Sequence, residues 1–206
     1  MTPPWISFCS VNPRLGIDPM LLKTLPTGGT KKKVAIVGGG PIGMRAAMMA
    51  AEQGHQVTLL EKTDYLGGQL RHSDYVSFKW PLRDYKDYLV RQLDKHGVTV
   101  RMNTLATPEL LEQEGFEAVI AATGAVPNIP KFAQDETGTL KAGLKTCLDV
   151  FGHEDELGKR VIIVGGSETG VETGMHLCEK GHEVTVLTRQ DEIAHDASHL
   201  HAITMA

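Results

Sequence analysis

Residues 32–62, KKVAIVGGGPIGMRAAMMAAEQGHQVTLLEK, decide the fold of this 206-residue chain. An apolar run at 34–37 leads into glycines at G-x-G-x-x-G spacing, and a second apolar run follows at 57–60. Short, continuous runs of this kind are typical of parallel strands that are buried on both faces. The stretch therefore predicts a strand, a glycine turn, a helix and a second strand, which is the opening of an α/β fold.

Each glycine of the motif has a separate expected role. Gly38 permits the tight turn out of the strand, Gly40 lets a diphosphate approach the backbone, and Gly43 lets the helix pack close to the strand. Free amides at the helix start attract phosphates. Glu61, at the end of the second strand, is placed to accept hydrogen bonds from ribose hydroxyls. Together these features predict a dinucleotide site.

Composition excludes several other classes of function. The net charge of −4 gives no electrostatic footprint for nucleic acid. No apolar run approaches the ~20 residues needed to span a membrane, and the first residues lack the pattern of a signal peptide. Cys9, Cys147 and Cys178 are far apart and odd in number, which argues against a disulfide framework. We expect a cytoplasmic protein that binds neither membranes nor nucleic acid.

Further elements of the first unit follow from periodicity. The sequence predicts a helix at 82–96, a strand at 98–102, a short helix at 108–114 and a strand at 118–122. Thr123 and Gly124 follow the last strand, at the sheet edge where α/β folds bind ligands; an ordinary turn is the alternative for this pair. The glycines of Gly67-Gly68-Gln69-Leu70 let the chain pass close to the first strand.

The opening pattern returns at 159–189, KRVIIVGGSETGVETGMHLCEKGHEVTVLTR. Aligned without gaps on 32–62, it is identical at 14 of 31 positions. A repeat of this length predicts a second dinucleotide unit. Ser167 replaces the middle glycine, and its hydroxyl is able to donate to a phosphate. Thr188 replaces Glu61 and precedes Arg189, which favours a 2′-phosphate and hence NADPH. A solvated surface role is the alternative for Arg189.

The repeat gives a domain plan. We expect an N-terminal arm at 1–31, a first nucleotide domain at 32–130, a connection at 131–158 with a short helix near 145–151, and a partial second unit at 159–206. The expected fold class is α/β, a Rossmann-like fold with two dinucleotide-binding units, in which a parallel sheet has flanking helices and the second unit is incomplete.

The motifs resemble those of a known family of flavoproteins. The glycine motif with Glu61, the GGQL segment, Ala122-Thr123-Gly124 and a second glycine motif with Glu172 are similar to flavoproteins with two dinucleotide sites. Further segments resemble the C-terminal part of NADH:flavin oxidoreductases related to old yellow enzyme, such as 2-enoate reductase, 2,4-dienoyl-CoA reductase, trimethylamine dehydrogenase and the bile-acid-inducible flavoenzymes. These segments are Cys9-Ser10-Val11-Asn12-Pro13, Asp87–Leu93 and Asp191–Ala197.

The resemblance implies cofactors and a route for electrons. FAD would bind the first unit and NADPH or NADH the second. In the parent enzyme a [4Fe-4S] cluster would pass electrons to FMN in a barrel domain, for reduction of an enoate-type or enone-type substrate. By the match at Val11-Asn12-Pro13, Cys9 would be the fourth ligand of that cluster. The barrel and the other cluster cysteines are absent from these residues, so we expect a truncated piece that depends on a barrel and iron–sulfur domain.

No catalytic side chain is expected, because hydride transfer needs only stacked cofactor rings. The residues expected to bind the cofactors are Gly38, Gly40, Pro41, Gly43, Glu61, Lys62, Gly68, Gln69, Thr123 and Gly124 in the first unit, and Gly165, Ser167, Gly170 and Arg189 in the second. A disulfide reductase would need a C-x-x-C pair, which the sequence lacks. The alternative function is a nucleotide-binding fragment without turnover.

Overall fold

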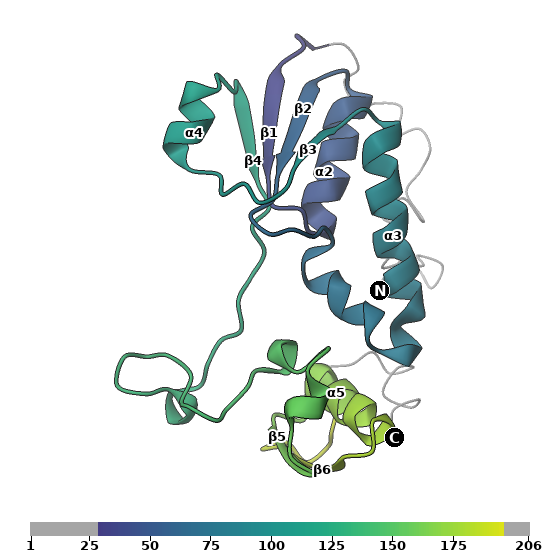
Figure 1. Ribbon diagram of the computed structural model, residues 1–206, viewed down its shortest axis with the longest axis vertical. Helices are drawn as coiled ribbons and strands as arrows, with labels where there is room; N and C mark the ends of the chain where they lie inside the picture. Colours follow the sequence, from purple (N-terminus) through teal and green to yellow (C-terminus); the bar gives the residue numbers. More distant parts are fainter. Residues whose placement is uncertain (1–28, 196–206) are drawn as a thin grey trace, which may run out of the picture. The chain divides into compact units, whose positions relative to one another are not determined.

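The computed structural model describes residues 29–195 (Figure 1). By their contacts, these residues form two compact units: 29–74 with 79–125, and 75–78 with 126–195. In the second unit, Ser77 Oγ donates to Glu179 Oε2 over 2.9 Å, so a four-residue segment from the first half of the chain, Tyr75–Phe78, belongs with the second unit. No helix in the described part is long and apolar enough to cross a membrane.

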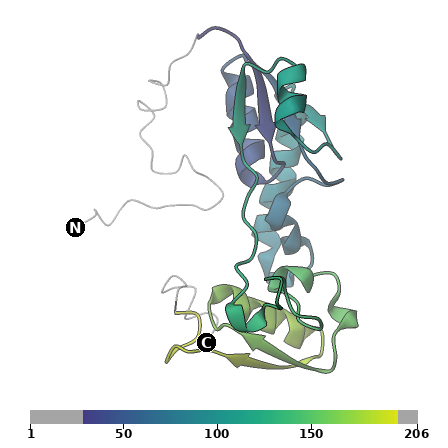
Figure 2. The same cartoon turned by 90° about the vertical axis from the view of Figure 1, so that its left-hand side faces the viewer.

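The first unit is built on a four-stranded parallel sheet in the order β3-β2-β1-β4 (Figure 1). Its strands are β1 (Lys33–Val37), β2 (Gln56–Leu60), β3 (Thr99–Arg101) and β4 (Ala118–Ala121). The helices are α2 (Pro41–Glu52), which connects β1 to β2, α3 (Trp80–Lys95), which precedes β3, and α4 (Pro108–Gln113), which precedes β4. Helices α2 and α3 pack against each other, and α4 lies beside β4, away from them (Figure 1; Figure 2 shows the same ribbon turned by 90°).

The core of the first unit lies between the sheet and helices α2 and α3. Alternate residues of β1 and β2 face these helices, as the two-residue period of a strand requires. The buried cluster comprises Val34, Ile36, Val57, Leu59 and Val98 from the sheet side, and Met44, Ala47, Met48, Leu89 and Leu93 from the helices. Met44 and Met48 of α2 are therefore core residues, whereas Met49 of the same helix is exposed.

Short 3₁₀ segments connect β2 to α3. They are η1 (Gly68–Asp74) and η2 (Ser77–Lys79), and the sequence pattern does not reveal either of them. Helix α3 is followed by Gly97 at φ +66°, a left-handed conformation that suits the glycine predicted to end the helix. Thr107 caps α4, since its hydroxyl accepts a hydrogen bond from the Leu110 amide (3.2 Å).

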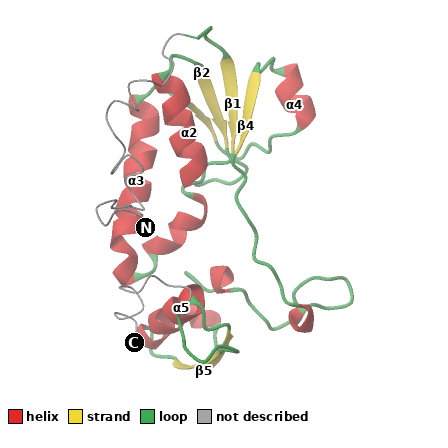
Figure 3. Ribbon diagram, turned by 180° about the vertical axis from the view of Figure 1, so that it is seen from behind, coloured by secondary structure: helices red, strands yellow, loops and turns green. Residues whose placement is uncertain are grey.

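The second unit contains a two-stranded parallel sheet, β5 (Arg160–Val164) with β6 (Glu183–Leu187), and helix α5 (Glu168–Glu179) between them (Figure 3). Ile163 and Leu177 are buried together with Val150 from the preceding segment. That segment holds 3₁₀ turns η3 (Lys131–Ala133), η4 (Cys147–Asp149) and η5 (Glu154–Glu156); η4 falls where the sequence predicts a short helix. Buried His176 of α5 contacts Glu154 of η5, with Nε2 and Oε1 2.6 Å apart.

Both units place the first turn of a helix directly against the end of the preceding strand. A Cβ added to Gly43 would overlap the carbonyl oxygen of Gly38, and a Cβ on Gly170 would overlap that of Gly165. No side-chain rotation relieves such an overlap, because the carbonyl oxygen belongs to the backbone and the position of a Cβ is fixed by the backbone. The close packing predicted for the third glycine of the motif is therefore present in both units.

Two glycines of α5 give a matched prediction. Gly170→Ala should lower the free energy of unfolding by about 2 kcal/mol, because the overlap forces the helix off the strand. Gly174→Ala should raise it by roughly 0.5 kcal/mol, since alanine favours helix and the nearest atoms to its Cβ, such as Val184 Cγ1, lie at 3.5 Å. Urea denaturation of both variants measures the difference. Equal stabilities for the two would contradict the packing described here.

Candidate functional site

The turn after β1 requires glycine at its first position. Gly38 has φ +108°, and a Cβ there would overlap the carbonyl oxygen of Ala122 at the end of β4. Its amide donates to the Leu60 carbonyl over 2.9 Å, which joins the turn to the end of β2. The ends of β1, β2 and β4 therefore meet at Gly38, at the carboxyl edge of the parallel sheet where α/β folds bind ligands.

The first turn of α2 offers amides to an anion. Gly40 is the N-cap residue, no side chain caps the helix, and Pro41 occupies the start of the first turn. The amides of Ile42 and Gly43 have no partner within the helix, as in the first turn of any α-helix. A Cβ on Gly40 would meet only Gly68 Cα, at 3.9 Å. The backbone is thus open to close approach, and its donors fit a negatively charged phosphate.

Glu61 is buried beside this turn and oriented by the protein itself. Its Oε2 accepts from the Gly39 amide (2.7 Å), and Oε1 accepts from the amide and hydroxyl of Thr63 (both 2.8 Å). Burial by itself raises the pKa of Glu61, but these hydrogen bonds and the Lys62 charge bring the pKa below its ordinary 4.5. The carboxylate is therefore ionised at neutral pH, and Oε2 keeps a lone pair for a further donor.

Gly39 and Thr63 are site residues that the sequence reasoning missed. A Cβ on Gly39 would lie 2.5 Å from Leu66 Cδ2 and 3.1 Å from Glu61 Oε2, so the glycine is needed to seat the carboxylate. The sequence signal for Gly39 is that it is the middle residue of the run Gly38-Gly39-Gly40. Lys62, which the sequence predicts as a cofactor-binding residue, is exposed.

The GGQL segment lies against the same turn. The Gly67 amide donates to the Gly39 carbonyl (2.8 Å), and a Cβ on Gly68 would lie 3.0 Å from Gly40 Cα. Gln69 reaches across to the end of β4, where its Nε2 donates to the Ala125 carbonyl over 2.8 Å. Three segments far apart in the sequence, 38–43, 67–69 and 122–125, therefore converge on one place.

Thr123 and Gly124 extend from β4 on this edge of the sheet. The preceding Ala122 amide still donates to the Val37 carbonyl (2.8 Å), so β4 stays paired with β1 up to the point where Thr123 begins. Gly124 has φ +74° and no atom within 4 Å of the position a Cβ would take. The pair lies beside the turn at Gly38, as its place in the sequence predicts.

The second unit repeats this framework with equivalent backbone contacts. The Gly165 amide donates to Leu187 (2.8 Å) as Gly38 donates to Leu60, and the Ala194 amide donates to Gly166 (2.7 Å) as Gly67 donates to Gly39. Ser167 is the N-cap of α5, and its side chain makes no capping hydrogen bond. The repeat detected in the sequence is therefore a repeat of hydrogen-bonded geometry.

The two units differ at the residue that follows the second strand. A Cβ on Gly166 would lie 2.7 Å from Thr188 Cβ, so Thr188 occupies the place that Glu61 has beside Gly39. Its hydroxyl accepts from the Gln190 amide (3.1 Å), and the neighbouring Arg189 is exposed. Glu168 in the first turn of α5 is a further difference, since proline stands at the equivalent place in α2, and the sequence reasoning did not use it.

Other candidate sites add little. Cys9, expected as a cluster ligand in a parent enzyme, lies outside the described residues. Within residues 29–195 no group of three His, Cys, Asp or Glu side chains is arranged to hold a metal ion. A surface hollow of about 490 Å³ lies between α3, β3 and residues 64–66, and no predicted nucleotide-binding residue lines it.

Comparison with known proteins connects this geometry to a family. Residues 107–205 match the model of pyridine nucleotide-disulphide oxidoreductases, and residues 33–81 match that of FAD dependent oxidoreductases. Similar proteins include an NADH oxidase of Thermoanaerobacter brockii, 37% identical over 91% of this chain and 29% of its own length. A cinnamate reductase of Clostridium sporogenes is 36% identical over 90% of this chain and 27% of its own length.

A solved structure supports the same assignment. A 2-naphthoyl-CoA reductase complex superposes with a TM-score of 0.85 at 32% identity, over 96% of this chain and 29% of that chain. The chain thus spans less than a third of each of these proteins. The chain is therefore similar to flavoenzymes of the NADH oxidase, cinnamate reductase and 2-naphthoyl-CoA reductase type, and its two halves match models of FAD-dependent and pyridine nucleotide oxidoreductases.

Proposed function

We propose that this chain is the electron-entry module of an NAD(P)H-dependent flavin oxidoreductase, with FAD in the first unit and the nicotinamide nucleotide in the second. The observation that carries the proposal is the paired framework. Two βαβ units present a helix start to a diphosphate, and they differ at the ribose position, where Glu61 corresponds to Thr188. When bound, the flavin supplies the electron-acceptor chemistry for hydride from the nicotinamide ring.

In the first unit, the protein would bind FAD and orient it. The amides of Ile42 and Gly43 would hold the diphosphate, and Gly40 would admit it to the backbone. Glu61 would accept a ribose hydroxyl at Oε2, since Gly39 and Thr63 already fix the carboxylate in place. Gly68, Gln69 and Thr123 lie around the same turn and, with Gly124 and Pro41, would contact the cofactor. Exposed Lys62, next to Glu61, would contact it as well.

In the second unit, Gly165, Ser167 and Gly170 would form the corresponding cradle. Thr188 places no negative charge at the ribose, and Arg189 adds a positive charge next to it. A carboxylate repels a 2′-phosphate, whereas a guanidinium binds one through two parallel hydrogen bonds. The second unit should therefore prefer NADPH to NADH.

The rest of the parent protein has a proposed role as well. Because the chain spans less than a third of its relatives, a barrel domain with FMN and a [4Fe-4S] cluster would receive the electrons and reduce an enoate-type or enone-type substrate. Cys9 would be one ligand of that cluster. The competing function is a nucleotide-binding piece without turnover, which the short span of the chain favours.

The first test is colour. The purified 206-residue chain, reconstituted with FAD and desalted, should retain the visible flavin band, which should bleach without oxygen when NADPH is added. The measurement is an absorbance spectrum before and after the nucleotide. Retained colour without bleaching would favour nucleotide binding without turnover, and loss of all colour on desalting would contradict the assignment of FAD to the first unit.

Glu61→Gln tests the ribose contact. The variant should bind FAD about tenfold more weakly, because hydrogen bonds to a charged acceptor contribute ~1.5 kcal/mol or more. Glu112→Gln, an exposed residue of α4, is the matched control and should bind as the unaltered chain does. Fluorescence titration of FAD measures both. Unchanged affinity in the Glu61 variant would remove this residue from the site.

The same carboxylate predicts a pH dependence. Because the pKa of Glu61 in the folded chain lies below 4.5, its stabilising hydrogen bonds are fully present above pH 4.5 and are lost as the pH falls through the folded pKa. The unaltered chain should therefore lose stability below pH 4.5 more steeply than the Glu61 variant does. Parallel pH profiles for the two would count against an ionised, hydrogen-bonded Glu61.

Arg189→Gln tests the choice of nicotinamide nucleotide. Affinity for NADPH should fall about tenfold, because a charge-assisted contact to the 2′-phosphate is lost, and affinity for NADH should hardly change. Arg160→Gln, an exposed arginine at the opposite end of the β5–β6 sheet, is the control. Dissociation constants from titration of each nucleotide decide the matter. A preference of the unaltered chain for NADH would refute the proposed specificity.

A further inference from the structure

The backbone turn at Gly67, which lies next to the proposed FAD site, is covered by the side chain of Lys86 from α3. Gly67 has φ +108° and is buried, and its amide is bound to the Gly39 carbonyl (2.8 Å). A Cβ on Gly67 would lie 2.7 Å from Lys86 Cδ and 2.8 Å from Lys86 Cγ. The aliphatic stem of Lys86 therefore lies directly on the backbone of the turn, which leaves room only for glycine.

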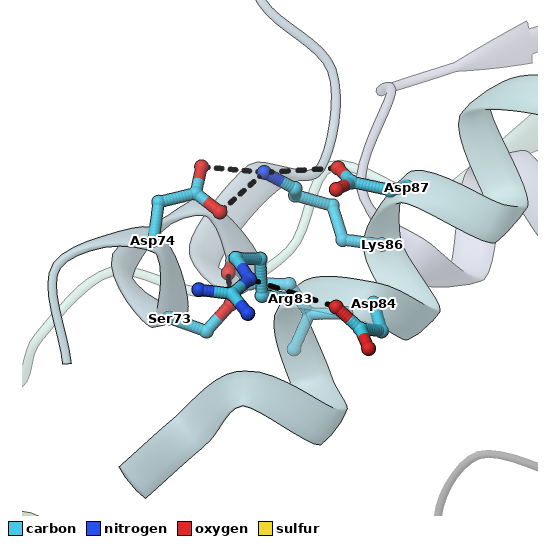
Figure 4. A network of polar contacts seen from close by, with 7 residues as sticks. Ser73, Asp74, Arg83, Asp84, Lys86 and Asp87 are labelled. Carbon is cyan, nitrogen blue, oxygen red and sulfur yellow. Dashed lines mark hydrogen bonds and ion pairs between the residues drawn. The ribbon is translucent and has the colours of Figure 1, made fainter. Parts of the chain in front are cut away.

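The charged end of Lys86 is bound to the far end of the same segment. Its Nζ donates to Asp74 Oδ1 (2.6 Å), contacts Asp74 Oδ2 as well, and lies 3.4 Å from Asp87 Oδ1 (Figure 4). The Lys86 side chain is only 11% exposed. The neighbouring Arg83–Asp84 pair, by contrast, is exposed and 3.6 Å apart (Figure 4). Lys86 thus makes a well-formed ion pair in which the lysine is largely buried and the Asp74 carboxylate is 39% exposed, whereas a typical surface pair has two exposed partners and contributes little.

Segment 67–74 is therefore held at both ends and in the middle. The turn at its start lies under the Lys86 stem, Asp74 at its end is paired with Nζ, and Ser73 Oγ donates to the Leu70 carbonyl (2.6 Å) within it. Apart from these contacts, the sequence GQLRHSD shows no apolar period that would make it fold by itself. The contact with α3 therefore acts together with the Gly67–Gly39 and Gln69–Ala125 hydrogen bonds to hold this segment beside Gly40.

We propose that Lys86 is a positioning residue for cofactor binding: by holding segment 67–74 against the 38–43 turn, it sets the affinity of the first unit for FAD. The inference rests on the proposed function, because it assigns a consequence to the same site. Lys86 does not touch the turn at Gly38–Gly43 itself; it acts through Gly67 and Gly68, which do. Without the ammonium group, the carboxylates of Asp74 and Asp87 would repel each other with no positive charge between them. Segment 67–74 would then move away from α3.

Lys86→Met is the informative variant, since methionine keeps much of the stem and removes the charge. If the segment is closed in only about a fifth of the molecules, FAD affinity falls about fivefold, because apparent affinity scales with the competent fraction. Asp74→Asn should weaken binding to a similar degree. The double variant should be no weaker than either single one, since both remove the same interaction.

A second readout does not involve flavin. In the chain without added FAD, the Gly67 amide should lose most of its protection from exchange in Lys86→Met, because the open fraction rises to about four fifths, while the amides of β1 and β2 keep their protection. Lys86→Arg restores the positive charge and should return both affinity and exchange close to the starting values. Lys95→Met makes the same chemical change at an exposed position of α3 and serves as the control.

The outcomes separate the two proposals. If the unaltered chain binds no FAD, the proposed function fails, and this inference fails with it. If the unaltered chain binds FAD and Lys86→Met binds it equally well, only the role of Lys86 is overturned. A loss of affinity accompanied by equally faster exchange in β1 and β2, unrelieved by Lys86→Arg, would also overturn it, because Lys86 would then support the fold as a whole.

Discussion

The structure depends on one steric constraint, which is the contact between the first turn of a helix and the end of the strand before it. Gly43 has no Cβ, so α2 begins directly against the Gly38 carbonyl. This closeness carries the free amides of the helix start to the carboxyl edge of the sheet, where Glu61 and the GGQL segment also arrive. A side chain at Gly43 would separate the helix from the strand and take the donors away from the other groups.

The close contact between helix and strand occurs in both units. The two units differ in charge at a position outside this contact, the residue that follows the second strand. Gly170 repeats the contact in the second unit, and the backbone hydrogen bonds around it are the same. The residue after the second strand is not part of this packing, so it is free to vary between an acid and a threonine. In the proposed function, one framework would serve two nucleotides: the rigid part would recognise the diphosphate that FAD and NADPH share, and the variable position would distinguish the ribose.

The sequence predicted what local pattern and repetition encode. The strands and helices of the first unit, the glycine that follows α3 and the equivalence of Glu61 and Thr188 all follow from period, glycine spacing and self-alignment. What it could not predict depends on long-range contact. Segment 68–74 has no periodic signal and makes long-range contacts such as those of Gln69 with Ala125 and of Asp74 with Lys86. Tyr75–Phe78 belongs with the second unit through contacts such as that of Ser77 with Glu179. The hydrogen bond from the Gly39 amide to Glu61 could not be predicted either, because the sequence does not show which glycine of the run will lie beside the carboxylate.

The most direct test of the central claim follows the amides themselves. The chain labelled with nitrogen-15 would be titrated with ADP, which has the diphosphate and ribose of both nucleotides but no redox ring. The account predicts that the amide resonances of Gly40, Ile42 and Gly43 shift first, together with Gly39 beside Glu61. Shifts confined to other residues, such as those around the hollow between α3 and β3, with the 38–43 turn unmoved, would contradict it.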